Sequence, residues 1–196
     1  MRVAVVGVQG DVEEHVLATK MAMKNLGIDG EVVAVRKSGI VSKSDAVIIP
    51  GGESTTISKL IFADSISKEI VELAEIGKPV MGTCAGLIVL SKFGDEQVAK
   101  TRTKLLKLLD VKVKRNAFGR QRESFQTKLE MKKVGEVDAI FIRAPIIEDV
   151  GKDVEILAEF EGKIVAVQQG KILGLAFHPE LSTTKVHEFF LSLAEP

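Results

Sequence analysis

The sequence predicts an α/β fold in which one open, mixed sheet lies between two layers of helices, with the later strands partly antiparallel. Three observations predict it. In the first half, short β-branched runs alternate with helical patterns, which is typical of parallel sheets. The first of these runs, RVAVVGV, is apolar without alternation, as expected for a strand covered on both faces. In the second half, alternating strands are separated by tight-turn signals, which favour antiparallel pairing.

Strands and helices alternate over the first half of the chain. Residues 2–8 predict a strand, and residues 11–26 carry apolar side chains at helical spacing up to Gly27, a plausible C-cap. Further strands are predicted at 31–36, 45–50 and 79–83, a helical region in two pieces at 55–76, and a helix at 85–93.

The second half is richer in strands. Strands are predicted at 111–116, 123–131 and 139–145, followed by a meander over 155–177 with turns near Glu161-Gly162 and Gln169-Gly170. A helix is predicted at 183–194, and residues 94–103 predict a loop or short helix. Residues 94–113 are rich in lysine and carry no recognisable motif.

Composition limits the classes of function. A length of 196 residues without a repeat or linker predicts one domain over residues 1–196. Lys+Arg and Asp+Glu both number 27, which argues against a general binder of nucleic acid or anionic membranes. With a single cysteine no internal disulfide can form. We find no signal-peptide pattern and no apolar stretch of about 18 residues, so we expect a cytoplasmic protein.

The single cysteine lies in a sequence typical of a reactive residue. Cys84 stands between Gly82 and Gly86 where a predicted strand turns into a predicted helix, the G-x-nucleophile-x-G pattern of a nucleophile elbow. Such a turn needs small residues two positions away, because strand and helix approach closely there. The alternative is a buried structural cysteine, which does not explain the glycines.

A base for this cysteine is sought among three histidines. His178 follows an apolar strand, and Glu180, two residues on, would face the same way and orient its imidazole. Cys84, His178 and Glu180 therefore form a candidate catalytic triad. His15 and His187 lie in predicted amphipathic helices, where we expect them to be solvated or half-buried and structural.

Acyl chemistry also needs donors for an oxyanion. The N–H of Ala85, directly after the nucleophile, is one candidate. Gly52, in the sequence Pro50-Gly51-Gly52 after a strand, is the second. A plain turn followed by a helix cap explains the same glycines.

Taken together, these motifs resemble the class I (triad) glutamine amidotransferases, which have a flavodoxin-like fold. GVQGDVEEH, PGGESTT, GTCAGLIVL, RNAFGRQ, FIRAP and FHPEL follow in the order found in the glutaminase subunits of pyridoxal 5′-phosphate synthase. The resemblance extends from residue 3 to about residue 190.

The resemblance implies roles for individual residues. Cys84 would be the nucleophile and His178 the base, oriented by Glu180. The resemblance further implies a glutamine-binding set of Gly52, Glu53, Ser54, Arg115, Ile142 and Arg143. Arginine is the usual partner of a carboxylate such as that of free glutamine.

The implied activity is hydrolysis of L-glutamine to glutamate and ammonia, without a metal or organic cofactor. The implied protein partner is the synthase subunit that receives the ammonia, and in this family the glutaminase is weak until it docks. Gln9 and Gly10 are expected near that docking surface. Three alternatives remain: the glutaminase of another synthase, such as that for imidazole glycerol phosphate; a non-catalytic amidotransferase-like regulatory module; and a cysteine hydrolase acting on peptides or esters.

Overall fold

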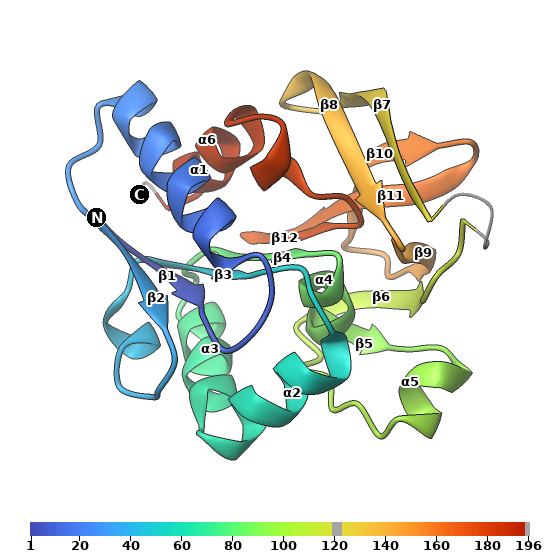
Figure 1. The fold of residues 1–196 in the computed structure, drawn as a ribbon, viewed down its shortest axis with the longest axis horizontal. Helices are drawn as coiled ribbons and strands as arrows, with labels where there is room; N and C mark the ends of the chain where they lie inside the picture. The colour runs from blue at the N-terminus through green and yellow to red at the C-terminus, as the bar shows by residue number, and fades with distance from the viewer. Residues whose placement is uncertain (119–122, 195–196) are drawn as a thin grey trace.

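The parallel half of the sheet is built as the alternating pattern predicts. The structure is a computed structural model that describes residues 1–118 and 123–194. Strands β1 (Arg2–Val6), β2 (Glu31–Val35), β3 (Ala46–Ile49) and β4 (Val80–Thr83) lie in the order β2-β1-β3-β4 and pair in parallel (Figure 1). β3 and β4 are buried along their whole length, which explains their continuous apolar sequence.

The second half extends this sheet with strands that pair mostly in the antiparallel sense. From β4 the order continues β12-β11-β9-β6-β5, and β10 pairs with β11. β12 is parallel to β4, β11 is antiparallel to β12, β10 and β9, β6 is antiparallel to β9, and β5 is parallel to β6. The bounds are β5 Ser91–Phe93, β6 Leu109–Lys114, β9 Ile146–Val150, β10 Glu155–Phe160, β11 Lys163–Gln169 and β12 Ile172–Leu175. The predicted mixed sheet and meander are confirmed.

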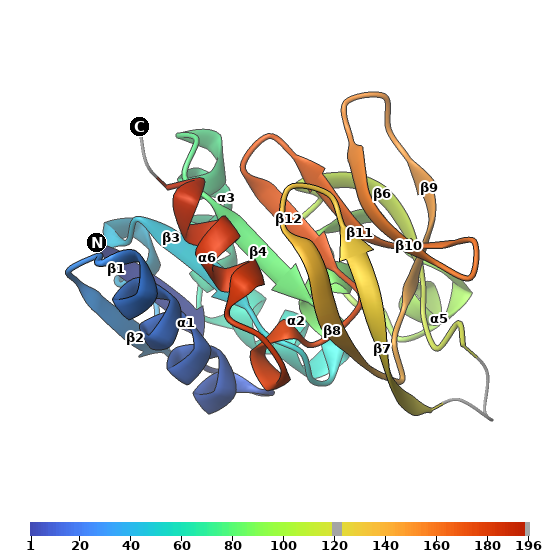
Figure 2. The same cartoon turned by 90° about the horizontal axis from the view of Figure 1, so that it is seen from above.

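Helices cover both faces. The helices are α1 (Val12–Leu26), α2 (Ser54–Ala63), α3 (Ile66–Glu75), α4 (Ala85–Leu90), α5 (Glu96–Lys100) and α6 (Lys185–Ser192), with 3-10 turns η1 (Val41–Lys43) and η2 (Pro179–Leu181). α1 packs against α6 on one face, and α2 packs against α3 and α4 on the other (Figures 1 and 2). Gly27 ends α1 in the left-handed conformation, as its C-cap position predicts.

Three details differ from the sequence predictions. The helix predicted at 85–93 ends at Leu90, because residue 91 becomes extended and residues 91–93 pair with β6 instead. β9 was not predicted, since its sequence IIEDV offers little apolar alternation. The strands β7 (Ser124–Met131) and β8 (Gly135–Ile142) form a separate two-stranded sheet beside η2.

No helix in the described ranges 1–118 and 123–194 is both long and apolar enough to cross a membrane. Part of the RNAFGRQ motif, residues 119–121, lies outside these ranges.

Candidate active site

The backbone at Cys84 has the geometry of a nucleophile elbow. Cys84 links β4 to α4 with φ 48° and ψ −103°, a conformation that a non-glycine residue rarely adopts. A Cβ on Gly82 would lie 2.6 Å from the backbone of Gly86, and a Cβ on Gly86 would lie 2.0 Å from the carbonyl oxygen of Ile49. Both glycines are therefore needed for the strand and helix to approach.

The thiol of Cys84 lies at the floor of a small pocket. Its Sγ is 3.7 Å from the carbonyl oxygen of Ile142, and its side chain is mostly buried. Its backbone N–H donates to the carbonyl of Leu175, the last residue of β12. The nucleophile candidate is thus held by the strand that leads to His178.

His178 and Glu180 form the predicted pair, although not on a strand. β12 ends at Leu175, and His178 caps the 3-10 turn η2 that contains Glu180. His178 Nδ1 lies 2.6 Å from Glu180 Oε1, so the hydrogen bond forms through a turn rather than through the spacing of a strand. The backbone N–H of His178 donates to Ile140 in β8, which fixes the turn against the separate hairpin.

The pKa of His178 is raised to about 12. Burial, the largest influence, acts to lower it, but hydrogen bonds with Asp11, Cys84 and Glu180 and the charge of Glu180 outweigh burial. The ring nitrogen Nε2 has no partner of good hydrogen-bond geometry among the described residues. Nδ1 is used by Glu180, which leaves Nε2 as the ring nitrogen available to the neighbouring Cys84 thiol. The raised pKa favours the protonated imidazole.

Asp11 is a site residue that the sequence analysis missed. Its Oδ2 lies 3.3 Å from His178 Nδ1, and the pKa of Asp11 is lowered, chiefly by the hydrogen bond with His178. The sequence signal was its place at the carboxyl end of the first strand, where sites form in such sheets. Asp11, His178 and Glu180 bring three ligand-type atoms within 4.8 Å of one another, but the bond between His178 and Glu180 occupies two of them.

Of the glycine pair after β3, Gly51 packs against His178 and Gly52 lines the pocket of Cys84. A Cβ on Gly51 would lie 2.4 Å from His178 Cε1, so the imidazole packs directly on this backbone. Gly52 has φ 143°, which favours glycine. The Glu53 N–H that follows donates to Gln9 Oε1 at 2.8 Å, which ties this loop to the end of β1.

One pocket of about 300 Å³ collects almost every predicted site residue. The predicted residues that line it are Gly52, Glu53, Ser54, Cys84, Ala85, Arg115, Ile142, Arg143 and His178. Glu180 lies behind His178 with a fully buried side chain. Four further lining residues were not predicted to bind substrate: Gln9, Asp11, Ile88 and Asn116.

The charged side chains of this pocket differ in burial and in whether they already have a partner. Arg115 is largely buried, its Nη1 has no partner among the described residues, and its Nη2 lies 3.9 Å from Glu53 Oε1. Glu53 caps α2 by accepting from the N–H groups of Thr55 and Thr56. Arg143 is exposed with φ 42°. Arg115 is therefore the cation positioned to receive an anionic group.

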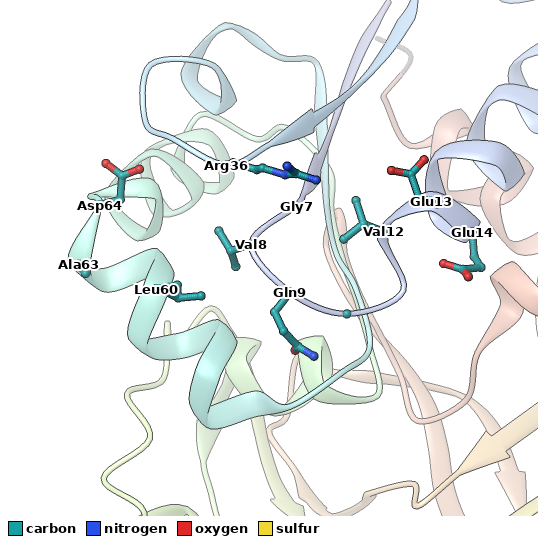
Figure 3. A pocket seen from close by; sticks show the side chains of 11 residues that line it. Gly7, Val8, Gln9, Val12, Glu13, Glu14, Arg36, Leu60, Ala63 and Asp64 are labelled. Carbon is teal, nitrogen blue, oxygen red and sulfur yellow. The ribbon is translucent and has the colours of Figure 1, made fainter.

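A second, larger hollow of about 840 Å³ lies at the end of β1 (Figure 3). Val8 and Leu60 give it apolar surface, and Glu13, Glu14, Arg36 and Asp64 supply charges. Gln9 lines both this hollow and the pocket of Cys84. The two cavities therefore share one side chain.

The prediction that His15 and His187 are solvated or half-buried was wrong. Both side chains are completely buried, where α1 and α6 pack together. The helical spacing located the helices but did not show that these polar residues face the core.

Comparisons with known proteins agree with the geometry. The family model described as "SNO glutamine amidotransferase family" matches residues 5–195 of this chain. The chain is 74% identical over 196 residues to "Pyridoxal 5′-phosphate synthase subunit PdxT" of Archaeoglobus fulgidus, covering 100% of this chain and 99% of that protein. It is 48% identical to the protein of the same name from Methanosarcina mazei, with 97% of each chain covered.

Solved structures show the same fold. A structure described as "Crystal structure of glutamine amidotransferase" superposes with a TM-score of 0.87 at 43% identity, over 98% of each chain. The structure of PurLQS from Thermotoga maritima, at 17% identity and a TM-score of 0.64, covers 98% of this chain and 96% of that one, and shares the fold. The chain therefore belongs to the SNO glutamine amidotransferase family, and the relatives reported above carry the name pyridoxal 5′-phosphate synthase subunit PdxT.

Proposed function

We propose that Cys84, His178 and Glu180 hydrolyse the side-chain amide of L-glutamine to glutamate and ammonia. The observation that supports this most is that Cys84 and His178 line one pocket, with Glu180 hydrogen-bonded behind the imidazole. This arrangement gives a nucleophile, a proton carrier and a group that orients it.

The reaction proceeds in two halves. The Cys84 thiolate attacks the amide carbon, and the N–H groups of Ala85 and Gly52 stabilise the tetrahedral oxyanion. Protonated His178 gives its proton to the leaving ammonia, which fits the raised pKa of this residue. Water then attacks the γ-glutamyl thioester while neutral His178 accepts its proton, which restores the starting state.

The other residues that line the pocket of Cys84 orient the substrate. Arg115 binds the α-carboxylate of glutamine, because its buried Nη1 has no other partner among the described residues. Gly52, Glu53, Ser54, Ile142 and Arg143 complete the glutamine site around the elbow.

The test measures glutamate formation with and without the synthase subunit. We expect activity in the complex, and its loss to background in Cys84→Ala. A glutamine-analogue electrophile should label only Cys84, the single cysteine. Absence of Cys84-dependent glutamate in the complex would refute a catalytic role and favour a non-catalytic module. Hydrolysis of peptides or esters in preference to glutamine would favour the hydrolase alternative.

The protein partner is the synthase subunit that uses the ammonia, and it docks over the hollow at the end of β1. Gln9 links that hollow to the loop beside Cys84 through the Glu53 N–H, so docking there can reach the oxyanion loop. Leu60→Glu should weaken the complex, measured by calorimetric titration. Ile76→Glu is the matched control, because Ile76 is an exposed apolar residue that follows α3, away from the hollow. Equal weakening by both would refute this placement.

A further inference from the structure

A pair of buried histidines lies directly behind the candidate triad. His15 Nδ1 is 3.0 Å from His187 Nε2, and both side chains are completely buried. Burying two imidazoles is costly unless their nitrogens are used, so such a pair calls for a structural or functional reason.

The pair continues to the triad carboxylate. His15 Nε2 lies 3.0 Å from Thr83 Oγ1 and 3.3 Å from Glu180 Oε2. Glu180 Oε1 binds His178, and Oε2 has no partner of good hydrogen-bond geometry among the described residues. His15 is therefore the ring that faces the second oxygen of Glu180, inside a fully buried environment.

The acceptor at the end of this series of contacts, Glu180, determines where the protons lie on the two imidazoles. Burial raises the pKa of Glu180, and the hydrogen bond with His178 acts in the opposite direction. With Glu180 ionised and accepting only, a proton on His15 Nε2 can face both Glu180 Oε2 and Thr83 Oγ1. His15 Nδ1 is then an acceptor, and His187 Nε2 must donate to it. The remaining nitrogen, His187 Nδ1, is left as a lone pair, and it has no partner among the described residues. In the opposite tautomers Thr83 Oγ1 would donate to Nε2, and the lone pair of His15 would face Glu180.

We propose that His15 is a positioning residue of the glutaminase reaction, holding Glu180 in the orientation that His178 needs, and that His187 fixes the tautomer of His15. His15 touches neither substrate nor Cys84, and acts through Glu180 and His178. The proposal rests on the proposed function. In it, a donor on Oε2 restricts rotation of the carboxylate and offsets the cost of burying its charge.

Two variants separate the two ends of His15. Counted along the side chain, the amide nitrogen of Gln stands as far from Cα as His Nε2, whereas that of Asn stands where Nδ1 does. His15→Gln therefore keeps the donor to Glu180, and His15→Asn keeps only the reach toward His187. In the complex with the synthase subunit, we expect the kcat of His15→Asn to be at least about tenfold below that of wild type. The kcat of His15→Gln should stay within about threefold of wild type. KM should stay within about twofold in both, because neither change touches the glutamine site.

The outcomes are distinct from those that test the proposed function. If wild type forms no glutamate, the proposed function fails. If wild type is active and the two variants have equal kcat, or if the loss appears in KM, the positioning role is overturned. Should His15→Asn not fold, the same comparison is made at the other ring, where His187→Gln keeps the donor to His15 and His187→Asn does not. Higher kcat in the Gln variant supports the proposal, and equal kcat refutes it.

Discussion

The buried histidine pair should make the protein less stable in mild acid. Burial lowers the pKa of His187 to about 4, against an opposing influence of the Glu188 charge. Burial, followed by the charges of His187 and His178, lowers the pKa of His15 well below its ordinary value of 6.5. Between pH 6.5 and 4 the unfolded chain takes up protons that the folded chain refuses. The free energy of unfolding therefore falls as the pH falls through this window.

The size of the effect follows for His187. The gap between 6.5 and about 4, at about 1.4 kcal/mol for each pH unit, amounts to about 3 kcal/mol. For a chain of this length that corresponds to a fall in Tm of roughly 6–12 °C. His178 adds no slope here. Its pKa is raised, so its contribution is fully present below 6.5 and is lost only as the pH rises toward 12.

Urea unfolding at several pH values between 6.5 and 4 measures this loss. The matched control is His187→Gln, which keeps a donor for His15 but does not titrate. Its curve should lose about 3 kcal/mol less than that of wild type over this window. Carboxylates titrate in both proteins and cancel in the difference. Parallel curves for the two proteins would refute the reasoning.

Three further predictions test the elbow, Asp11 and the α2 cap. Gly86→Ala should lower the free energy of unfolding by about 3 kcal/mol, against less than about 1 for Gly7→Ala, whose Cβ would come no closer than 3.3 Å to any atom; urea unfolding measures both, and equal losses would contradict the close approach. Asp11→Asn should lower the pKa of His178, so the alkaline limb of the pH profile of glutamate formation should move to lower pH; an unmoved limb would contradict the contact. Glu53→Ala should remove the cap of α2 and lower Tm by roughly 2–4 °C, with Glu53→Asp intermediate or better; an unchanged Tm would show that the cap adds nothing.

The sequence predicted the fold, and pointed to Cys84, His178 and Glu180 as triad candidates, because both inferences depend on local signals. The glycines around Cys84 are needed by the backbone itself, and the structure gives each a close neighbour. The bond between His178 and Glu180 was predicted for a strand and forms in a turn, because two residues of a 3-10 turn can also meet when the chain bends back. The predicted contact between His178 and Glu180 therefore forms even though the local backbone is a turn and not a strand.

What the sequence could not show depends on contacts between distant segments. His15 and His187 are 172 positions apart, and nothing in either helix indicates that the two rings meet. Asp11 reads as the start of a helix and becomes a neighbour of His178 only when the two ends of the chain pack together. The short strand 91–93 continues an apolar helical run and becomes extended because β6 lies beside it.

The position of β12 also determines when the site can exist. This strand is the last of the sheet to be synthesised, yet it lies at its centre, between β4 and β11. Until it inserts, the parallel and antiparallel halves of the sheet have no shared strand, and the thiol has neither its imidazole nor the backbone acceptor on Leu175. A nascent chain of only the first 170 residues therefore has an unpaired apolar strand edge on each half of the sheet, and its site is not assembled. Under the proposed function, insertion of β12 therefore completes the sheet and assembles the catalytic site in the same step.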